Sequence, residues 1–171
     1  MIGVGALSGI INAVLVSQVY YDTTEFILFG AGIPYGIVTG ICFIYVLPLT
    51  RKYLRLLAWI VASGVSYYVG TSIYLLSSRI LSDGSDAGSY ALAGFCGALI
   101  LTVIFHFIFH KMSLSKHAVV IVTGGIIPFI LAVTFYRDTW HIFASILYIV
   151  WQTVITTLLG SSLLSKEQKS V

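Results

Sequence analysis

Two histidines four residues apart are the side chains whose spacing most directly suggests chemistry. His106 and His110 share one face of a predicted helix, where two imidazoles could bind a transition metal weakly or sense pH. They lie beside Lys111, with His117 just across the predicted loop, and that loop contains no carboxylate to complete a metal cage. We therefore expect no metal site and no cofactor. pH sensing by His106 and His110 is the functional alternative to a hydrated cationic cluster.

Two amide side chains are the next candidates, because each lies inside a long apolar segment. Asn12 is near the middle of the first segment, and Gln152 lies toward the middle of the last one, next to Trp151. A polar side chain in hydrocarbon must form hydrogen bonds across helices or line a cavity. Both residues are therefore candidate substrate-binding residues, and a structural role between helices is the alternative for Asn12.

Charged side chains are missing from the interior of every apolar segment. Intramembrane carboxylates mark proton relays and cation coupling, so a carrier of that kind is disfavoured. A catalytic pair at depth has no candidate either, and we expect no enzyme. An enzyme that acts on a lipid would depend on His106, His110 and His117, which lack an acidic partner nearby.

The composition places these residues in a membrane protein. The chain has 171 residues, of which 58% are hydrophobic and 9% charged, and its mean hydropathy is +1.01. Soluble domains are about 45–50% apolar and about 25% charged. These values exclude an ordinary soluble domain, a disordered chain and a nucleic-acid binder. Two cysteines also exclude a disulfide scaffold.

The apolar segments are long enough to cross about 30 Å of hydrocarbon as helices. Charges and turn residues separate them into six. We predict an all-α integral membrane protein that forms a single transmembrane domain over residues 1–171. Its six transmembrane helices span about 2–20, 26–47, 53–77, 89–109, 117–136 and 139–164.

The basic residues test this count of spans. With six spans, seven of the nine Lys and Arg residues lie on one side of the bilayer, and only Arg79 and Arg137 lie on the other. Lys and Arg concentrate in cytoplasmic loops, so both termini are predicted to be cytoplasmic. The membrane is predicted to be a bacterial inner membrane or another plasma membrane.

The two halves of the chain, about 1–84 and 85–171, resemble one another. Residues 6–21 align with residues 91–106 at an offset of 85, which pairs Gly9 with Gly94. The second spans align at an offset of 94 and the third at an offset of 82. Because each half has three spans, the second copy must be inverted, as in many transporters. The sequence therefore predicts a 3+3 inverted-topology repeat, with chance similarity of apolar helices as the alternative.

Glycine and proline interrupt the second span of each half at equivalent places. These residues are Gly30 and Pro34 in the first half, and Gly124 and Pro128 in the second. Proline frees the carbonyl four residues back, and an unpaired carbonyl in hydrocarbon is costly. A solute could satisfy it, so these four residues complete the candidate substrate-binding set. Proline kinks that only shape the bundle are the alternative.

The second span also carries small residues at a spacing of four. Gly32, Gly36 and Gly40 share one helix face, where another backbone can approach closely. We predict that this face packs against a helix of the other half or of a second protomer.

Together these features predict a small membrane transporter or channel for a neutral or weakly charged solute or ion, with its site near the Gly/Pro breaks. The alternative is a substrate-capture or accessory subunit of a larger membrane complex. Substrate-capture subunits of ATP-driven vitamin importers are similar in size and span count. The expected partners are the lipid bilayer, a second copy in a homodimer or a membrane partner subunit, and no nucleic acid is expected.

Overall fold

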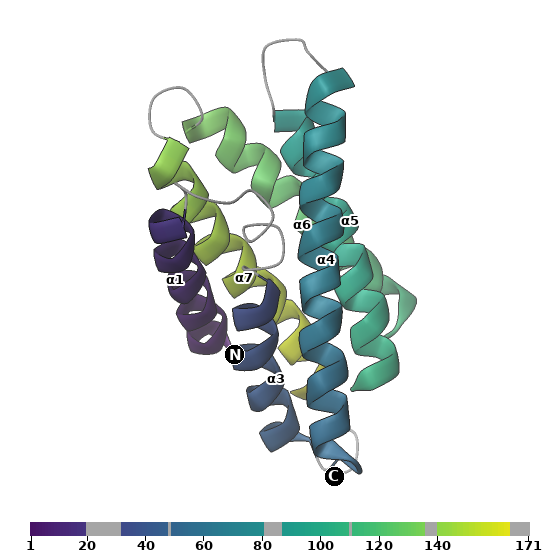
Figure 1. The fold of residues 1–171 in the computed structure, drawn as a ribbon. Helices are drawn as coiled ribbons and strands as arrows, with labels where there is room; N and C mark the ends of the chain where they lie inside the picture. The colour runs from purple at the N-terminus through teal and green to yellow at the C-terminus, as the bar shows by residue number, and fades with distance from the viewer. Residues whose placement is uncertain (20–31, 48, 81–86, 110, 136–139, 165–171) are drawn as a thin grey trace.

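The chain folds into an elongated bundle of helices (Figure 1). A computed structural model describes residues 1–19, 32–47, 49–80, 87–109, 111–135 and 140–164. Within them, the helices are α1 (Ile2–Val19), α3 (Gly32–Val46), α4 (Lys52–Ile80), α5 (Ala87–Ile108), α6 (Leu114–Phe135) and α7 (Trp140–Leu164). The predicted all-helical, membrane-type fold is confirmed for these residues. Gly30 and His110, two of the predicted site residues, lie outside them.

Four of the described helices are long and apolar enough to cross a membrane. They are α4, α5, α6 and the part of α7 from Ser145 to Leu163. The apolar stretches of α1 and α3 are shorter, Ile2–Leu15 and Gly32–Val46. The 15 residues of α3 extend over about 22 Å, less than the hydrocarbon thickness of about 30 Å. The described helices are therefore compatible with residence in a membrane.

The helices form a ring in chain order. Each described helix packs against the next one along the chain, and α7 closes the ring against α1. The most extensive contacts join α1 to α7, α5 to α6, and α4 to α5. Two of these three pairs join the first half of the chain to the second.

The helices alternate in direction around this ring. Met1 packs against Gly160 near the end of α7, and the Sγ atom of Cys42 near the end of α3 lies 3.8 Å from the Sδ atom of Met1. At the start of α4, the Nη1 atom of Arg55 donates a 2.6 Å hydrogen bond to the carbonyl oxygen of Ile108 at the end of α5. The starts of α1 and α4 therefore lie at the same end of the bundle as the ends of α3, α5 and α7.

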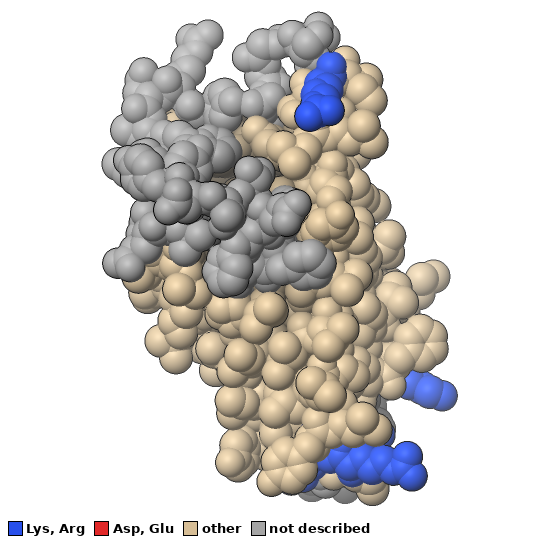
Figure 2. Space-filling model, viewed as in Figure 1, with Lys and Arg blue, Asp and Glu red and all other residues tan. Residues whose placement is uncertain are grey.

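Basic side chains gather at that same end. Figure 2 shows Lys and Arg at the lower end of the bundle, and one further basic site at the top. Arg79 ends α4 at the opposite end. Five of the six Lys and Arg residues that the structure describes flank the lower helix ends: Arg51, Lys52, Arg55, Lys111 and Lys116.

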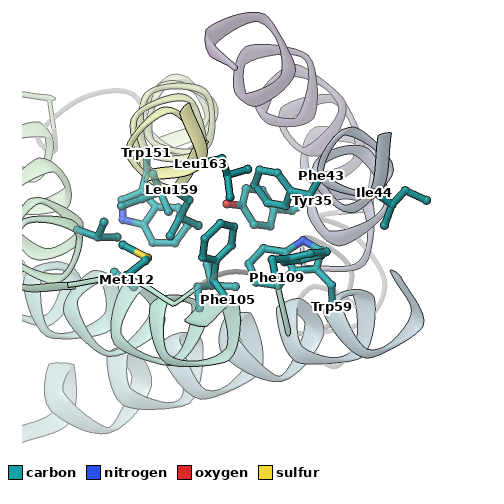
Figure 3. Packing of buried hydrophobic residues seen from close by; sticks show 14 residues of the cluster. Tyr35, Phe43, Ile44, Trp59, Phe105, Phe109, Met112, Trp151, Leu159 and Leu163 are labelled. Carbon is teal, nitrogen blue, oxygen red and sulfur yellow. The ribbon is translucent and has the colours of Figure 1, made fainter. Parts of the chain in front are cut away.

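Aromatic rings fill the core near the basic end (Figure 3). Phe43 of α3, Trp59 of α4 and Phe105 of α5 meet edge to face, with ring centroids 5.2–6.0 Å apart. All three side chains are fully buried. The indole Nε1 of Trp59 donates to the Oγ1 atom of Thr39 over 2.9 Å, so its polar group is satisfied. This cluster holds α3, α4 and α5 together.

The glycine face of α3 packs against α4. A Cβ atom at Gly32 would lie 2.5 Å from the carbonyl oxygen of Ser63, and one at Gly36 would lie 2.7 Å from the Cα atom of Ile60. Gly40 faces the side chains of Leu56 and Trp59 on the same helix. Close backbone approach therefore occurs on this face, as its spacing indicated. The helix that it meets belongs to its own half of the chain.

Candidate functional site

A chain of hydrogen bonds crosses the contact between α1 and α7, which we call the α1/α7 seam. The Oγ atom of Ser8 donates to the Oε1 atom of Gln152 over 2.7 Å. The Nε2 atom of Gln152 then donates to the phenolic oxygen of Tyr67 on α4 over 2.6 Å. Ser8 and Gln152 are fully buried. Three helices are thus joined by buried polar groups, none of which carries a charge.

Glycines bring the two helices of this seam close together. A Cβ atom at Gly5 would lie 2.6 Å from the Cα atom of Thr153, and one at Gly9 would lie 2.5 Å from the Cα atom of Ile149. Gly5, Ser8, Gly9 and Asn12 recur at helical spacing, so they share one face of α1. Asn12 therefore lies one turn beyond Ser8 on the face that packs against α7.

Asn12 is the unusual residue of the seam. Its side chain is fully buried, and neither Oδ1 nor Nδ2 has a hydrogen-bond partner among the residues that the structure describes. A buried donor or acceptor without a partner costs about 1–3 kcal/mol. The amide of Gln152, by contrast, uses both its oxygen and its nitrogen. Two predicted site residues thus belong to the helices of this seam. The amide of Gln152 has hydrogen-bond partners, and the amide of Asn12 has none among the described residues.

Aromatic side chains surround the amide of Gln152. The ring of Tyr67 lies 6.3 Å from that of Tyr148, 5.7 Å from that of Trp151 and 6.0 Å from that of Tyr35, measured between centroids. The sequence analysis did not single out these rings as site residues. Their position inside apolar segments, away from the boundaries where aromatic residues usually anchor, is the signal that could have found them.

No family model, no curated protein and no solved structure matches this chain. Its function is therefore inferred from the residues themselves. The α1/α7 seam is the starting point, because it combines buried polar groups, aromatic neighbours and an amide without a partner.

The glycine and proline of the second half lie in a different seam. Pro128 is inside α6, and the carbonyl four residues before it, that of Gly124, accepts a 2.9 Å hydrogen bond from the Nε1 atom of Trp151. A Cβ atom at Gly94 would collide with this carbonyl and with the ring of Pro128, so α5 and α6 are in close contact here. The carbonyl that could have bound a solute already has a protein partner.

Pro34 is placed differently in the first half. The described part of α3 begins at Gly32, and the carbonyl four residues before Pro34 belongs to Gly30, which lies outside the described residues. Asn12 and Gln152 thus belong to the two helices of the α1/α7 seam, whereas Gly124 and Pro128 lie at the contact between α5 and α6.

The histidines lie at the basic end. The Nδ1 atom of His106 accepts a 3.1 Å hydrogen bond from the backbone N–H of Met112, and the Nδ1 atom of His117 lies 2.8 Å from the carbonyl oxygen of Ser113. The two imidazole centroids are 5.0 Å apart. Within the described residues, no three His, Cys, Asp or Glu side chains form a group that could hold a metal ion. The histidine contacts brace the connection between α5 and α6.

Proposed function

We propose that the protein is a small membrane transporter or channel for a neutral or weakly charged solute, with its site in the α1/α7 seam. The observation that carries this proposal is the buried, uncharged chain of Ser8, Gln152 and Tyr67, with the open amide of Asn12 one turn away. Buried polar groups are costly, and polar side chains inside apolar helices either join helices by hydrogen bonds or line a solute path. The hydroxyl and amide groups of the seam can form hydrogen bonds with a solute, and none of them is charged.

The charge distribution favours a neutral solute. The described residues contain no Asp or Glu, and their Lys and Arg side chains lie at the helix ends. Moving an isolated ion into a low-dielectric interior is far more costly than moving a neutral polar molecule. The polar groups that the described residues place in the seam are hydroxyls and amides, which compensate a neutral molecule better than an ion.

We further propose six membrane crossings with both termini on the cytoplasmic side. The support is the alternation of helix direction around the ring, together with the position of Met1 beside the end of α7. Five of the six described basic residues lie at that same end, as the concentration of Lys and Arg in cytoplasmic loops requires.

The inverted repeat is part of the same proposal, and residue contacts support it. The sequence offsets of 85 and 82 make the α1/α7 seam equivalent to the contact between α5 and α4, which we call the α4/α5 seam. Ser8 bonds to Gln152, and their counterparts Ala93 and Gly70 also meet. A Cβ atom at Gly70 would lie 3.3 Å from the carbonyl oxygen of Ala93.

A second pair of contacts corresponds in the same way. A Cβ atom at Gly5 would lie 3.1 Å from the Cβ atom of Thr156. Their counterparts are Tyr90 and Tyr74, whose ring centroids are 4.5 Å apart. These two contacts support two copies of one three-helix unit, whereas the paired glycines differ, because Gly9 faces Ile149 of α7 and Gly94 faces Gly124 of α6.

A membrane-embedded capture or accessory subunit is the second candidate function. A shallow apolar groove between α5 and α6 favours it, since a helix of another subunit could pack there. Its lining residues are Ala91, Leu92, Phe95, Val122, Gly125, Ile126 and Phe129. Lipid chains could also fill an apolar groove of this kind. It therefore supports a subunit function less strongly than the polar seam supports transport.

Solute flux into liposomes tests the proposed function. Purified protein should accelerate the entry of small neutral solutes over protein-free liposomes, measured by stopped-flow light scattering, and Gln152→Leu should slow it. Ser66→Ala is the matched control, because it removes a 2.8 Å bond from a buried hydroxyl to the Gly97 carbonyl in the α4/α5 seam. Tight binding without flux would indicate a capture subunit, and the absence of both would indicate an accessory one. Either result would overturn the proposal.

A further inference from the structure

The polar side chains of the α1/α7 seam have small counterparts in the α4/α5 seam. By the offsets of the repeat, Ser8 corresponds to Ala93, Gln152 to Gly70 and Asn12 to Gly97. The α4/α5 seam is closed at this level, because the Oγ atom of Ser66 bonds to the carbonyl of Gly97. The chain of side-chain hydrogen bonds across α1 and α7 therefore has no counterpart among the corresponding residues of the α4/α5 seam.

The proposed repeat and the contact of a neighbouring glycine place Asn12 near Tyr148. Ser66 contacts Gly97, and the counterparts of this pair are Tyr148 and Asn12. Separately, a Cβ atom at Gly9, three residues before Asn12, would lie 2.9 Å from the carbonyl oxygen of Tyr148. Asn12 thus belongs at the level of Tyr148, whose ring stacks on that of Tyr67.

We infer that Asn12 selects the solute, and that the solute is a small amide or urea-type molecule. This inference rests on the proposed function. In the seam, the polar side-chain atoms of Ser8 and Gln152 each have a hydrogen-bond partner, whereas the Asn12 carboxamide carries a donor and an acceptor side by side with no partner among the described residues. Another carboxamide complements it with two parallel N–H···O bonds.

Other solute classes fit this group less well. An anion satisfies only the Nδ2 donor, and a cation satisfies only the Oδ1 acceptor. A diol can reach both atoms, but only by fixing the rotations of two separate hydroxyl groups, which costs conformational entropy. A planar amide or urea carries both groups in the required geometry before it binds.

Entry of the solute requires the seam to open. Both polar atoms of Asn12 are sealed from solvent in this conformation, and the close contacts at Gly5 and Gly9 hold α1 against α7. Separation of the two helices would break the bond between Ser8 and Gln152 and would expose the Asn12 amide. The unpaired amide disfavours the closed seam, so a solute that binds Asn12 stabilises the open one.

The test compares solutes of similar size in liposomes that contain the full chain. Urea and acetamide should enter through the wild-type protein about tenfold faster than ethylene glycol and glycerol, relative to their rates in protein-free liposomes. Asn12→Leu should abolish this preference, and so should Asn12→Asp at a pH where its carboxylate is ionised, because the carboxylate keeps the shape but has no donor. Ser66→Ala should retain it.

The two proposals fail in different ways. Diols that enter as fast as amides through the wild-type protein would leave the proposed function standing and overturn the assignment of an amide solute. A preference that persists in either Asn12 variant would also overturn the role of Asn12. No flux of any solute, from protein that is helical and monodisperse, would overturn the proposed function itself. The comparison of amide and diol entry through the wild-type protein tests the amide assignment even if neither Asn12 variant folds.

Discussion

The α1/α7 and α4/α5 seams each join the first half of the chain to the second, and the proposed repeat makes them equivalent, yet they differ in chemistry. In both, small residues bring two helices together, with Gly5 and Gly9 in one, and Gly70 and Gly97 in the other. Only the α1/α7 seam adds a buried polar chain. The α4/α5 seam packs with a hydrogen bond from the Ser66 hydroxyl to the Gly97 carbonyl, so two helices can pack closely here without a chain of polar side chains.

The seams also differ in how tightly their glycines are enclosed. A Cβ atom at Gly9 would lie 2.5 Å from a backbone atom of α7, whereas the nearest atom to a Cβ at Gly97 is the Ser66 Oγ at 3.6 Å. The first distance cannot be accommodated without moving a helix, and the second is an ordinary contact. The seam with the polar site is thus also the one that responds more strongly to added volume.

Added methyl groups should produce the largest difference between the two seams. Gly9→Ala should destabilise the protein by about 1–3 kcal/mol, because the new Cβ meets backbone that cannot rotate away. Gly97→Ala should be neutral or stabilising, since alanine is favoured over glycine within a helix by about 1 kcal/mol. Thermal unfolding in detergent measures both. Equal losses of stability would show that the seams do not differ in this way.

A smaller effect is expected from the hydrogen-bond chain. Gln152→Leu leaves Ser8 and the Tyr67 hydroxyl without their partner, which should cost about 1–3 kcal/mol for each group that stays buried. The double variant Ser8→Ala, Gln152→Leu should recover part of this loss, because one of the unpaired groups is gone. A double-mutant cycle on unfolding free energies measures the coupling. Strictly additive losses would mean that the bond contributes nothing to stability.

Much of the fold could be predicted from the sequence, because length and apolarity determine where membrane helices form. Five of the six predicted spans begin and end within a few residues of the described helices. The remaining one, 26–47, contains α3. Asn12 and Gln152 could also be found, since an amide is conspicuous in an apolar segment. Their neighbours could not, because helices that are apolar on all sides give no sign of how they are rotated.

The same limit explains the candidates around proline. The sequence showed that Pro128 frees the Gly124 carbonyl, but it could not show that Trp151 bonds to it from another helix. Likewise, the spacing of Gly32, Gly36 and Gly40 indicated a close contact without indicating that α4 is the partner. Which side chain satisfies a freed group depends on tertiary packing, and residue spacing within one helix does not encode that.

The central claim is that a solute path runs through the α1/α7 seam and not through the α4/α5 seam. Water access to the two seams tests this claim most directly. Ser8→Cys and Ala93→Cys place a thiol at equivalent positions, in a background where Cys42 and Cys96 are both replaced by serine. We predict that a small, neutral, water-soluble thiol reagent labels the Ser8→Cys protein in liposomes, that acetamide slows this labelling, and that the Ala93→Cys protein stays unlabelled. Equal labelling of both variants, or no labelling of the Ser8→Cys protein, would contradict it.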